Sequence, residues 1–136
     1  MRPAACALVA LAALALSCAK EGSLIGTWTA SDPDGNTQTI TFRKNGTADW
    51  QLQGDGESGR FEGLRWTFEE EARPAHLDLS GFAYGPLQDQ TLYCILDFPT
   101  HDSFRMDCAP GPSSPSGESA RPTTFDADAI TFGRAE

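Results

Sequence analysis

Apolar residues recur at every second position along almost the whole chain after residue 23, and glycine, proline, asparagine and aspartate separate the alternating stretches. A period of two places successive side chains on opposite faces of a strand, so each stretch predicts a strand with one apolar face. About eight such stretches follow one another at regular spacing. The expected fold is all-β, an antiparallel up-and-down meander that curls into a barrel or half-barrel.

The loop at Gly46 predicts how the two strands around it pair. A three-residue loop with Gly46 in the left-handed region places Phe42 opposite Ala48. It also places Ile40 opposite Trp50, so the apolar sides of both strands share one face. A two-residue turn would slip the register by one and separate these sides. We therefore expect the three-residue loop.

Two segments depart from the alternation. Phe61 is out of phase with Leu64 and Trp66, which predicts a β-bulge near Gly63. Residues 109–122 consist mainly of proline, serine and glycine. Such a composition does not favour a packed element, so we expect a mobile surface loop there.

Residues 91–108 are expected to form a strand, a turn and a strand. An antiparallel register that sets an aspartate against an arginine also gathers the apolar residues on the opposite face. The pairs expected in this register are Asp97 with Arg105, Phe98 with Phe104, Leu96 with Met106, and Cys94 with Cys108.

Cys94 and Cys108 raise three alternatives: metal ligands, a redox couple or a covalent staple. A structural zinc site uses four ligands, and the histidines of the chain are His76 and His101 alone. Directly opposed cysteines satisfy the geometry of a disulfide. Closing a loop of about 15 residues should stabilise the fold by roughly 3 kcal/mol. We expect the disulfide.

The N-terminus has the pattern of a secretory signal. A short basic start precedes an apolar run over residues 4–16, which is too short to cross a bilayer. The end of this run, Ala-Leu-Ser before Cys18, resembles the lipobox of bacterial lipoproteins. The resemblance implies a signal peptide over 1–17, an acylated Cys18, a tether over 18–23 and a single domain over 24–136. The alternative is ordinary signal cleavage near Cys18, with the cysteine incidental.

The charge of the expected mature chain narrows the class of partner. After residue 17 there are nine basic and nineteen acidic side chains, a net charge near −10. Nucleic acid and anionic lipid headgroups are polyanions, so they are unfavourable partners for such a surface. The charge is equally consistent with an envelope protein that simply stays soluble. The membrane would then be a partner through the lipid anchor alone.

A glycine and a tryptophan on the first expected strand, with an arginine on the last, form a further pattern. Gly26-x-Trp28 together with Arg134 resembles the lipocalin and calycin signature. In that family the tryptophan closes one end of the barrel and a late basic side chain lies across its ring. The resemblance implies that these three residues close a lipocalin-like barrel.

Four ordered blocks carry a longer resemblance, which covers most of residues 24–134. They are similar to the blocks of a lipocalin-like extracytoplasmic domain family that is common in planctomycetes and has no established activity. The resemblance implies fold and location more than function, and it places Arg121 near the barrel rim. There Arg121 would meet a ligand or donate hydrogen bonds to loop carbonyls. The blocks are RPAHLDLS (73–80), TLYCIL (91–96), FRMDCAP (104–110) and ARPTTF (120–125).

The residues do not form a pattern typical of an enzyme. His76 and Asp78 are two apart on one strand face without an expected nucleophile, and His101 lies in an expected hairpin tip. The sequence contains no cofactor fingerprint, so we predict no catalytic residue, metal or cofactor. An interior cavity would have Trp50 and Trp66 as its walls, although an eight-stranded barrel is narrow enough for side chains to fill.

Two functions remain as expectations. The first is a lipid-anchored binding module for a small apolar or amphipathic ligand. The second is an envelope protein with a filled barrel that contacts another macromolecule, such as an envelope protein. In both, the protein is exported to the cell envelope. Because Ala19, not aspartate, follows Cys18, the lipoprotein resemblance favours the periplasmic face of the outer membrane or the cell surface.

Overall fold

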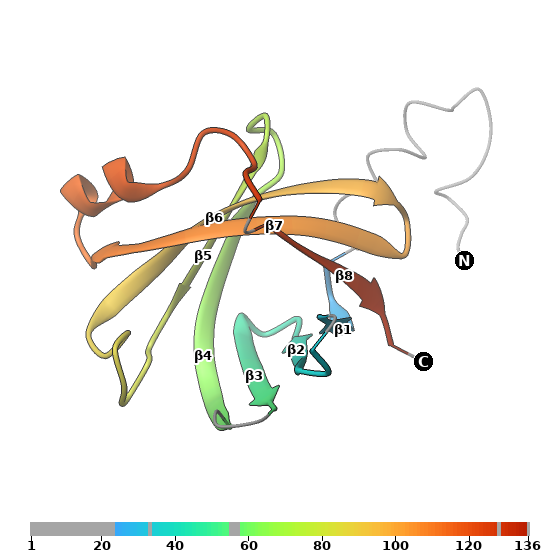
Figure 1. The fold of residues 1–136 in the computed structure, drawn as a ribbon. Helices are drawn as coiled ribbons and strands as arrows, with labels where there is room; N and C mark the ends of the chain where they lie inside the picture. The colour runs from blue at the N-terminus through green and yellow to red at the C-terminus, as the bar shows by residue number, and fades with distance from the viewer. Residues whose placement is uncertain (1–23, 33, 55–57, 128, 136) are drawn as a thin grey trace.

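The computed structural model describes residues 24–32, 34–54, 58–127 and 129–135. The expected signal peptide over 1–17, Cys18 and the tether over 18–23 lie outside these residues. The described chain forms eight antiparallel strands and one short 3-10 helix (Figure 1). These elements are β1 (Gly26–Ser31), β2 (Thr37–Phe42), β3 (Thr47–Gln53), β4 (Gly59–Glu69), β5 (Ala75–Ser80), β6 (Gln90–Thr100), β7 (Ser103–Pro112), η2 (Pro115–Ala120) and β8 (Ile130–Arg134).

Each strand pairs with its neighbours in the chain, and β8 returns to β1, so the sheet is a closed barrel. The predicted all-β, antiparallel up-and-down barrel is confirmed. The closing seam is short, because β1 and β8 pair only through Trp28 with Arg134 and Thr29 with Gly133. The amide of Ala135 extends the seam by donating to the carbonyl of Thr27 at 2.8 Å.

The predicted register around Gly46 is confirmed: Phe42 lies opposite Ala48, and Ile40 lies opposite Trp50. Gly46 has a φ of 90°, the left-handed conformation that the three-residue loop requires.

The predicted bulge in β4 is also present. Opposite Asp49 of β3 the β4 chain carries two residues, Glu62 and Gly63, where the register shifts. Gly63 has a φ of 70°, and its amide donates to the Asp49 carboxylate at 3.0 Å. The extra residue brings Phe61 into phase with the interior.

The β6–β7 hairpin follows the predicted register as far as Asp97, which lies opposite Arg105. Beyond it the register shifts, and Thr100 pairs with Ser103. Phe98 is therefore not in a simple pair with Phe104, as the alternation had predicted; Phe98 and Pro99 share the place opposite it. Proline has no N–H to donate to the ladder, which favours a bulge at this point.

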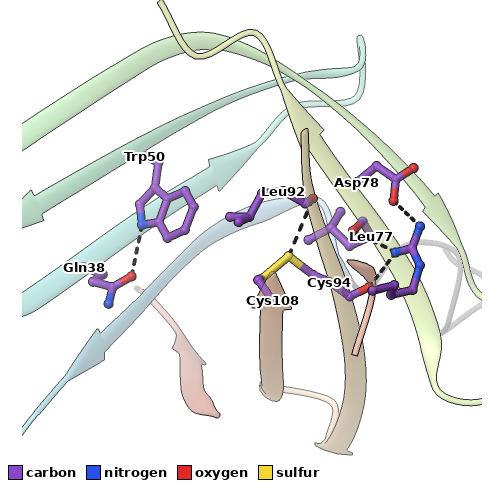
Figure 2. The surroundings of a disulfide bond; sticks show 8 residues. Gln38, Trp50, Leu77, Asp78, Leu92, Cys94 and Cys108 are labelled. Atoms are coloured by element: carbon purple, nitrogen blue, oxygen red, sulfur yellow. Dashed lines mark hydrogen bonds and ion pairs between the residues drawn. A yellow bond between two sulfur atoms is a disulfide. The ribbon is translucent and has the colours of Figure 1, made fainter. Parts of the chain in front are cut away.

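Cys94 and Cys108 are directly paired and form a disulfide, which confirms the predicted staple. Their Cα atoms are 4.0 Å apart. The bond lies on the inner face of the barrel, and Figure 2 shows it near Leu92 and Trp50. The disulfide thus joins two neighbouring strands from within the core.

The prediction that residues 109–122 hold no packed element is wrong. Strand β7 continues to Pro112, and η2 follows directly. In β7, Pro110 lies opposite Leu92, two residues from the cysteine pair. Paired Cα atoms as close as those of the cysteines are typical of non-hydrogen-bonded sites, where the N–H points away from the partner strand. Proline fits such a site without loss of a ladder bond.

Aromatic side chains pack at both ends of the barrel core. At the end where β1 begins, Trp28, Phe104 and Phe132 are fully buried and pack ring against ring. At the opposite end, Phe82 from the β5–β6 connection is buried against Phe61. Aromatic pairs of this kind add stability beyond the area that they bury.

Candidate functional site

Gly26, Trp28 and Arg134 meet at one end of the barrel in the arrangement that the lipocalin pattern implies. The Arg134 guanidinium lies over the Trp28 ring, 4.1 Å from its centroid. A Cβ on Gly26 would stand 2.8 Å from Arg134 Nη1, and Gly26 has a φ of 132°. The indole Nε1 donates to the carbonyl of Leu24 at 2.9 Å. These contacts join the start of β1 to the end of β8.

Trp50 and Trp66, the residues expected to line a cavity, have hydrogen-bond partners and pack against the core. The Trp50 indole donates to the side chain of Gln38 at 3.1 Å, as Figure 2 shows. The Trp66 indole donates to the carbonyls of Arg43 and Thr47, at 3.1 and 3.0 Å. The indole N–H groups of both residues therefore donate to other residues of the barrel.

The connection between β7 and β8 passes over the outer face of the sheet, and we call residues 113–127 the strap. In Figure 1 the orange-red segment leaves the end of β7, forms η2 and turns back across β6 and β7 before it enters β8. The amide of Asp126 donates to the Asp107 carboxylate of β7 at 3.1 Å. The Arg105 guanidinium lies 4.0 Å from the centroid of the Phe125 ring. The strap therefore has its own contacts along the sheet.

Arg121 holds the middle of the strap against β5 and β6. Its side chain is only 6% exposed. Nη1 donates to the carbonyls of Leu77 and Cys94, at 3.3 and 2.8 Å. Nη2 donates to the carboxylates of Asp78 and Glu118, at 2.6 and 3.1 Å. Arg121 lies on the outer face of the barrel, and the carbonyls that it binds belong to strands rather than to loops.

The 3-10 helix η2 packs against Tyr93 of β6. Tyr93 is an outward-facing residue of this strand, yet it is buried. Its hydroxyl donates to the carbonyl of Pro112 at 2.6 Å. Two glycines allow this close approach: a Cβ on Gly117 would stand 1.9 Å from the Pro112 oxygen, and one on Gly111 would stand 3.0 Å from Ala120. The strap and the sheet thus share a small second core.

Two grooves, each of about 310 Å³, flank Glu118 where the strap stands over the sheet. The first, which we call the hydroxyl groove, has polar walls. The second, the proline groove, has a buried isoleucine, two prolines and three basic side chains among its lining residues. The hydroxyl groove includes Thr67, Asp78, Ser80, Thr91 and Ser114. The proline groove includes Arg73, Pro74, His76, Ile95, Arg121 and Pro122.

His76 lies in the wall of the proline groove, between two carboxylates. Its Nδ1 is 3.7 Å from the Glu69 carboxylate of β4 and 3.8 Å from the Glu118 carboxylate of η2. Both distances exceed those of a hydrogen bond. His101 lies in the turn between β6 and β7 and is exposed. The structure therefore separates the two histidines.

The site could be found only in part from the sequence. The sequence points to Arg121, but it does not single out Tyr93, Gly117 or Glu118. One signal was available: the central residues of β6, Leu-Tyr-Cys-Ile-Leu over 92–96, are apolar on both faces. A strand that is apolar on both faces must be covered on both sides, and the strap provides the outer cover. What the sequence did not reveal is which segment covers it.

Comparisons with protein-family models, with curated proteins and with solved structures found no match. Within the part of the chain that the structure describes, no helix is long and apolar enough to cross a membrane.

Proposed function

We propose that this protein is a non-enzymatic, exported protein of the cell envelope, anchored by lipid at Cys18, whose filled barrel contacts another envelope molecule through its outer face. The barrel is then a rigid support, and the strap with its two grooves is the contact surface. The lipobox resemblance supports the anchor, and the period-two sequence supports a compact barrel.

The observation that carries this proposal is the contrast between the two faces of the sheet. The inward side chains pack into one core, in which Trp50 is 9% exposed and Trp66 is partly buried. The outer face of β4 to β6 carries both grooves, at least as large as the lower end of the range for ligand sites. A filled interior and a grooved exterior favour recognition on the outside.

Native mass spectrometry of the full-length protein, purified in detergent from its own membrane, tests the anchor and the partner together. We expect the mass of a chain that begins at an acylated Cys18, with two hydrogens lost to the disulfide. We also expect a copurified envelope component that is lost when the groove-lining Ser119 and Thr123 are changed to tryptophan. An unmodified Cys18 would contradict the anchor.

A lumen ligand is the alternative to this proposal. Titration with a fluorescent fatty-acid analogue checks it, because an analogue bound between Trp50 and Trp66 would quench tryptophan emission. We expect no saturable quenching. Saturable binding that Trp50→Ala abolishes would replace the proposed outer contact with a lumen site.

A further inference from the structure

The proline groove contains two buried nitrogen atoms that the fold does not satisfy. Within the described residues, Arg121 Nε and His76 Nδ1 have no hydrogen-bond partner. Both residues line the same groove. Buried polar groups in native proteins are nearly always hydrogen-bonded, and leaving one unpaired costs about 1–3 kcal/mol. Two such atoms in one groove indicate a missing partner there.

The unsatisfied edge of Arg121 has the geometry for a carboxylate. Nε and Nη2 lie on the same edge of the guanidinium, the edge that carboxylates bind with two parallel hydrogen bonds. Glu118 occupies this edge through Nη2, at 3.1 Å, and the Asp78 carboxylate accepts from the same nitrogen at 2.6 Å. The Leu77 and Cys94 carbonyls fix the other side of the guanidinium. Arg121 is therefore held in place, with Nη2 bonded to two carboxylates and Nε without a hydrogen-bond partner among the described residues.

Two guanidinium groups lie at the proline groove, although the chain as a whole has a net charge of −9. Arg73 and Arg121 line the groove together with one carboxylate, that of Glu118. The Asp78 carboxylate lies outside the lining and accepts from Arg121 Nη2 at 2.6 Å. Arg73 donates to two backbone carbonyls at the groove rim. Glu69 lies outside the lining but faces His76, so it competes for this imidazole.

The remaining lining consists of three apolar residues, Pro74, Ile95 and Pro122, and of the hydroxyl-bearing Ser119 and Thr123. Ile95 is buried at the groove, and Pro74 and Pro122 are rigid side chains without donors. A volume of about 310 Å³ is at the small end of the range for ligand sites. These features fit a short apolar group next to the charged head.

We propose that the proline groove binds a small molecule that carries a carboxylate beside a short apolar body. The carboxylate accepts hydrogen bonds from Arg121 Nε and Nη2 and from the Nδ1–H tautomer of His76, and Glu118 moves aside. Glu118 is 54% exposed and belongs to η2, so it has room to turn into solvent. It acts as an internal competitor that occupies the anion site when the ligand is absent.

This inference goes beyond the proposed function, because it requires neither acylation of Cys18 nor a protein partner. The lipid anchor and ligand binding in the proline groove are therefore tested by separate experiments. A failed mass-spectrometric test of the anchor leaves the groove as it is, and a groove that binds no acid leaves the anchor as it is.

The test is a nuclear magnetic resonance titration of the exported full-length protein in detergent. The probe is N-acetyl-L-leucine, and its neutral amide, N-acetyl-L-leucinamide, is the matched control. We expect the acid to shift the Arg121 Nε–H resonance downfield with saturation in the millimolar range. The amide should bind at least tenfold more weakly, since it lacks the charge.

Three variants separate recognition from folding, and none of them removes the buried Arg121. His76→Leu should raise the Kd for the acid about fivefold or more, and Arg73→Gln should raise it by a smaller factor. Glu118→Gln should lower the Kd, because it removes the competing charge. Equal binding of acid and amide, weaker binding by Glu118→Gln, or shifts confined to Trp50 and Trp66 would each overturn the proposal.

Discussion

At the scale of single residues, two arginine side chains make contacts that stabilise the barrel. Arg134 covers the Trp28 ring and passes directly over Gly26. Arg43 binds the Asp49 carboxylate on the neighbouring strand, and that carboxylate also accepts the amide of the β4 bulge. The Arg134 contact joins the two ends of the barrel strand order, and the Arg43 contact joins the two sides of the β2–β3 hairpin. Substituting either residue of such a contact should therefore change the stability of the barrel.

Changing Gly26→Ala should destabilise the barrel by about 1–3 kcal/mol, the usual range for a residue forced into a sparsely populated conformation. The new Cβ would also stand 2.8 Å from Arg134 Nη1. Urea denaturation measures the effect. The control is Gly59→Ala, where the nearest neighbour, the Tyr84 hydroxyl, is 3.8 Å away. A loss in the control as large as that in Gly26→Ala would argue against the Arg134 contact.

Stability should fall as the pH falls below about 4, in part through Asp49. Hydrogen bonds from Arg43 and then from the Gly63 amide hold the pKa of the Asp49 carboxyl below its ordinary value. A lowered folded-state pKa contributes stability that is present above the unfolded pKa, about 3.9, and is lost as pH falls through the folded pKa. Denaturation at a series of pH values should give a smaller acid slope for Asp49→Asn.

Arg43→Gln provides the matched test of the same pair. It should reduce the acid slope as Asp49→Asn does, and the double variant should add little, because residues in contact are not additive. Fully additive slopes would mean that the two residues act separately.

At the scale of elements, the hairpin of β6 and β7 makes stabilising contacts on both of its faces. On its inner face the disulfide joins the two strands, and on its outer face Tyr93 and Asp107 receive the strap. Both faces of this hairpin are covered, unlike a sheet with one side in water. The disulfide and the strap therefore stabilise the same two strands from opposite sides.

Removing the disulfide should lower the unfolding free energy by about 3 kcal/mol, because the closed loop is about 15 residues long. Cys94→Ala with Cys108→Ala is the variant, and denaturant unfolding is the measurement. Wild-type protein treated with a thiol reductant should lose a similar amount. A reduced wild type as stable as the oxidised one would contradict the predicted contribution.

Gly117→Ala should displace η2 from its contact with Tyr93, because a Cβ at position 117 would stand 1.9 Å from the Pro112 oxygen. Overpacking of this kind usually costs about 1–3 kcal/mol. Hydrogen exchange should quicken over residues 113–121 while β2 and β3 stay protected. Ser116→Ala, in the same helix but exposed, is the control. Unchanged exchange in the strap would show that η2 does not depend on this contact.

The elements were predictable to different degrees because they depend on contacts of different range. The registers at Gly46 and at Cys94 each follow from side chains within a single hairpin, so alternation and loop length are enough to predict them. The strap depends on contacts between Arg121 and carbonyls 27 and 44 residues away. No local pattern encodes such a distance, and its proline and serine content predicted a loop instead. The contacts that the strap makes at the candidate site could therefore not be predicted from the sequence.

At the scale of the whole molecule, the barrel is a continuous ladder with one short seam. Between β6 and β7 the pairing runs from Gln90 to Thr100, whereas β1 and β8 meet through two pairs. Regions with few pairs open locally at lower free energy than the rest. The β1–β8 seam is therefore where the barrel should open first.

Native-state hydrogen exchange tests this order. The Ala135 amide, which donates across the seam to Thr27, should exchange at least tenfold faster than the amides of Cys94 and Leu96. Gly26→Ala should widen the gap, since it disturbs the same end. Equal protection at the seam and in β6 would mean that the barrel opens only as a single cooperative unit.

The seam has a practical consequence for handling the protein. Since Trp28 pairs with Arg134, the polypeptide enters and leaves the fold on the same side. A reporter fused after Arg134 would therefore lie at the same end of the barrel as the start of β1. The β1–β2 and β5–β6 turns lie at the opposite end of the barrel, so a label attached there would leave the β1–β8 seam undisturbed.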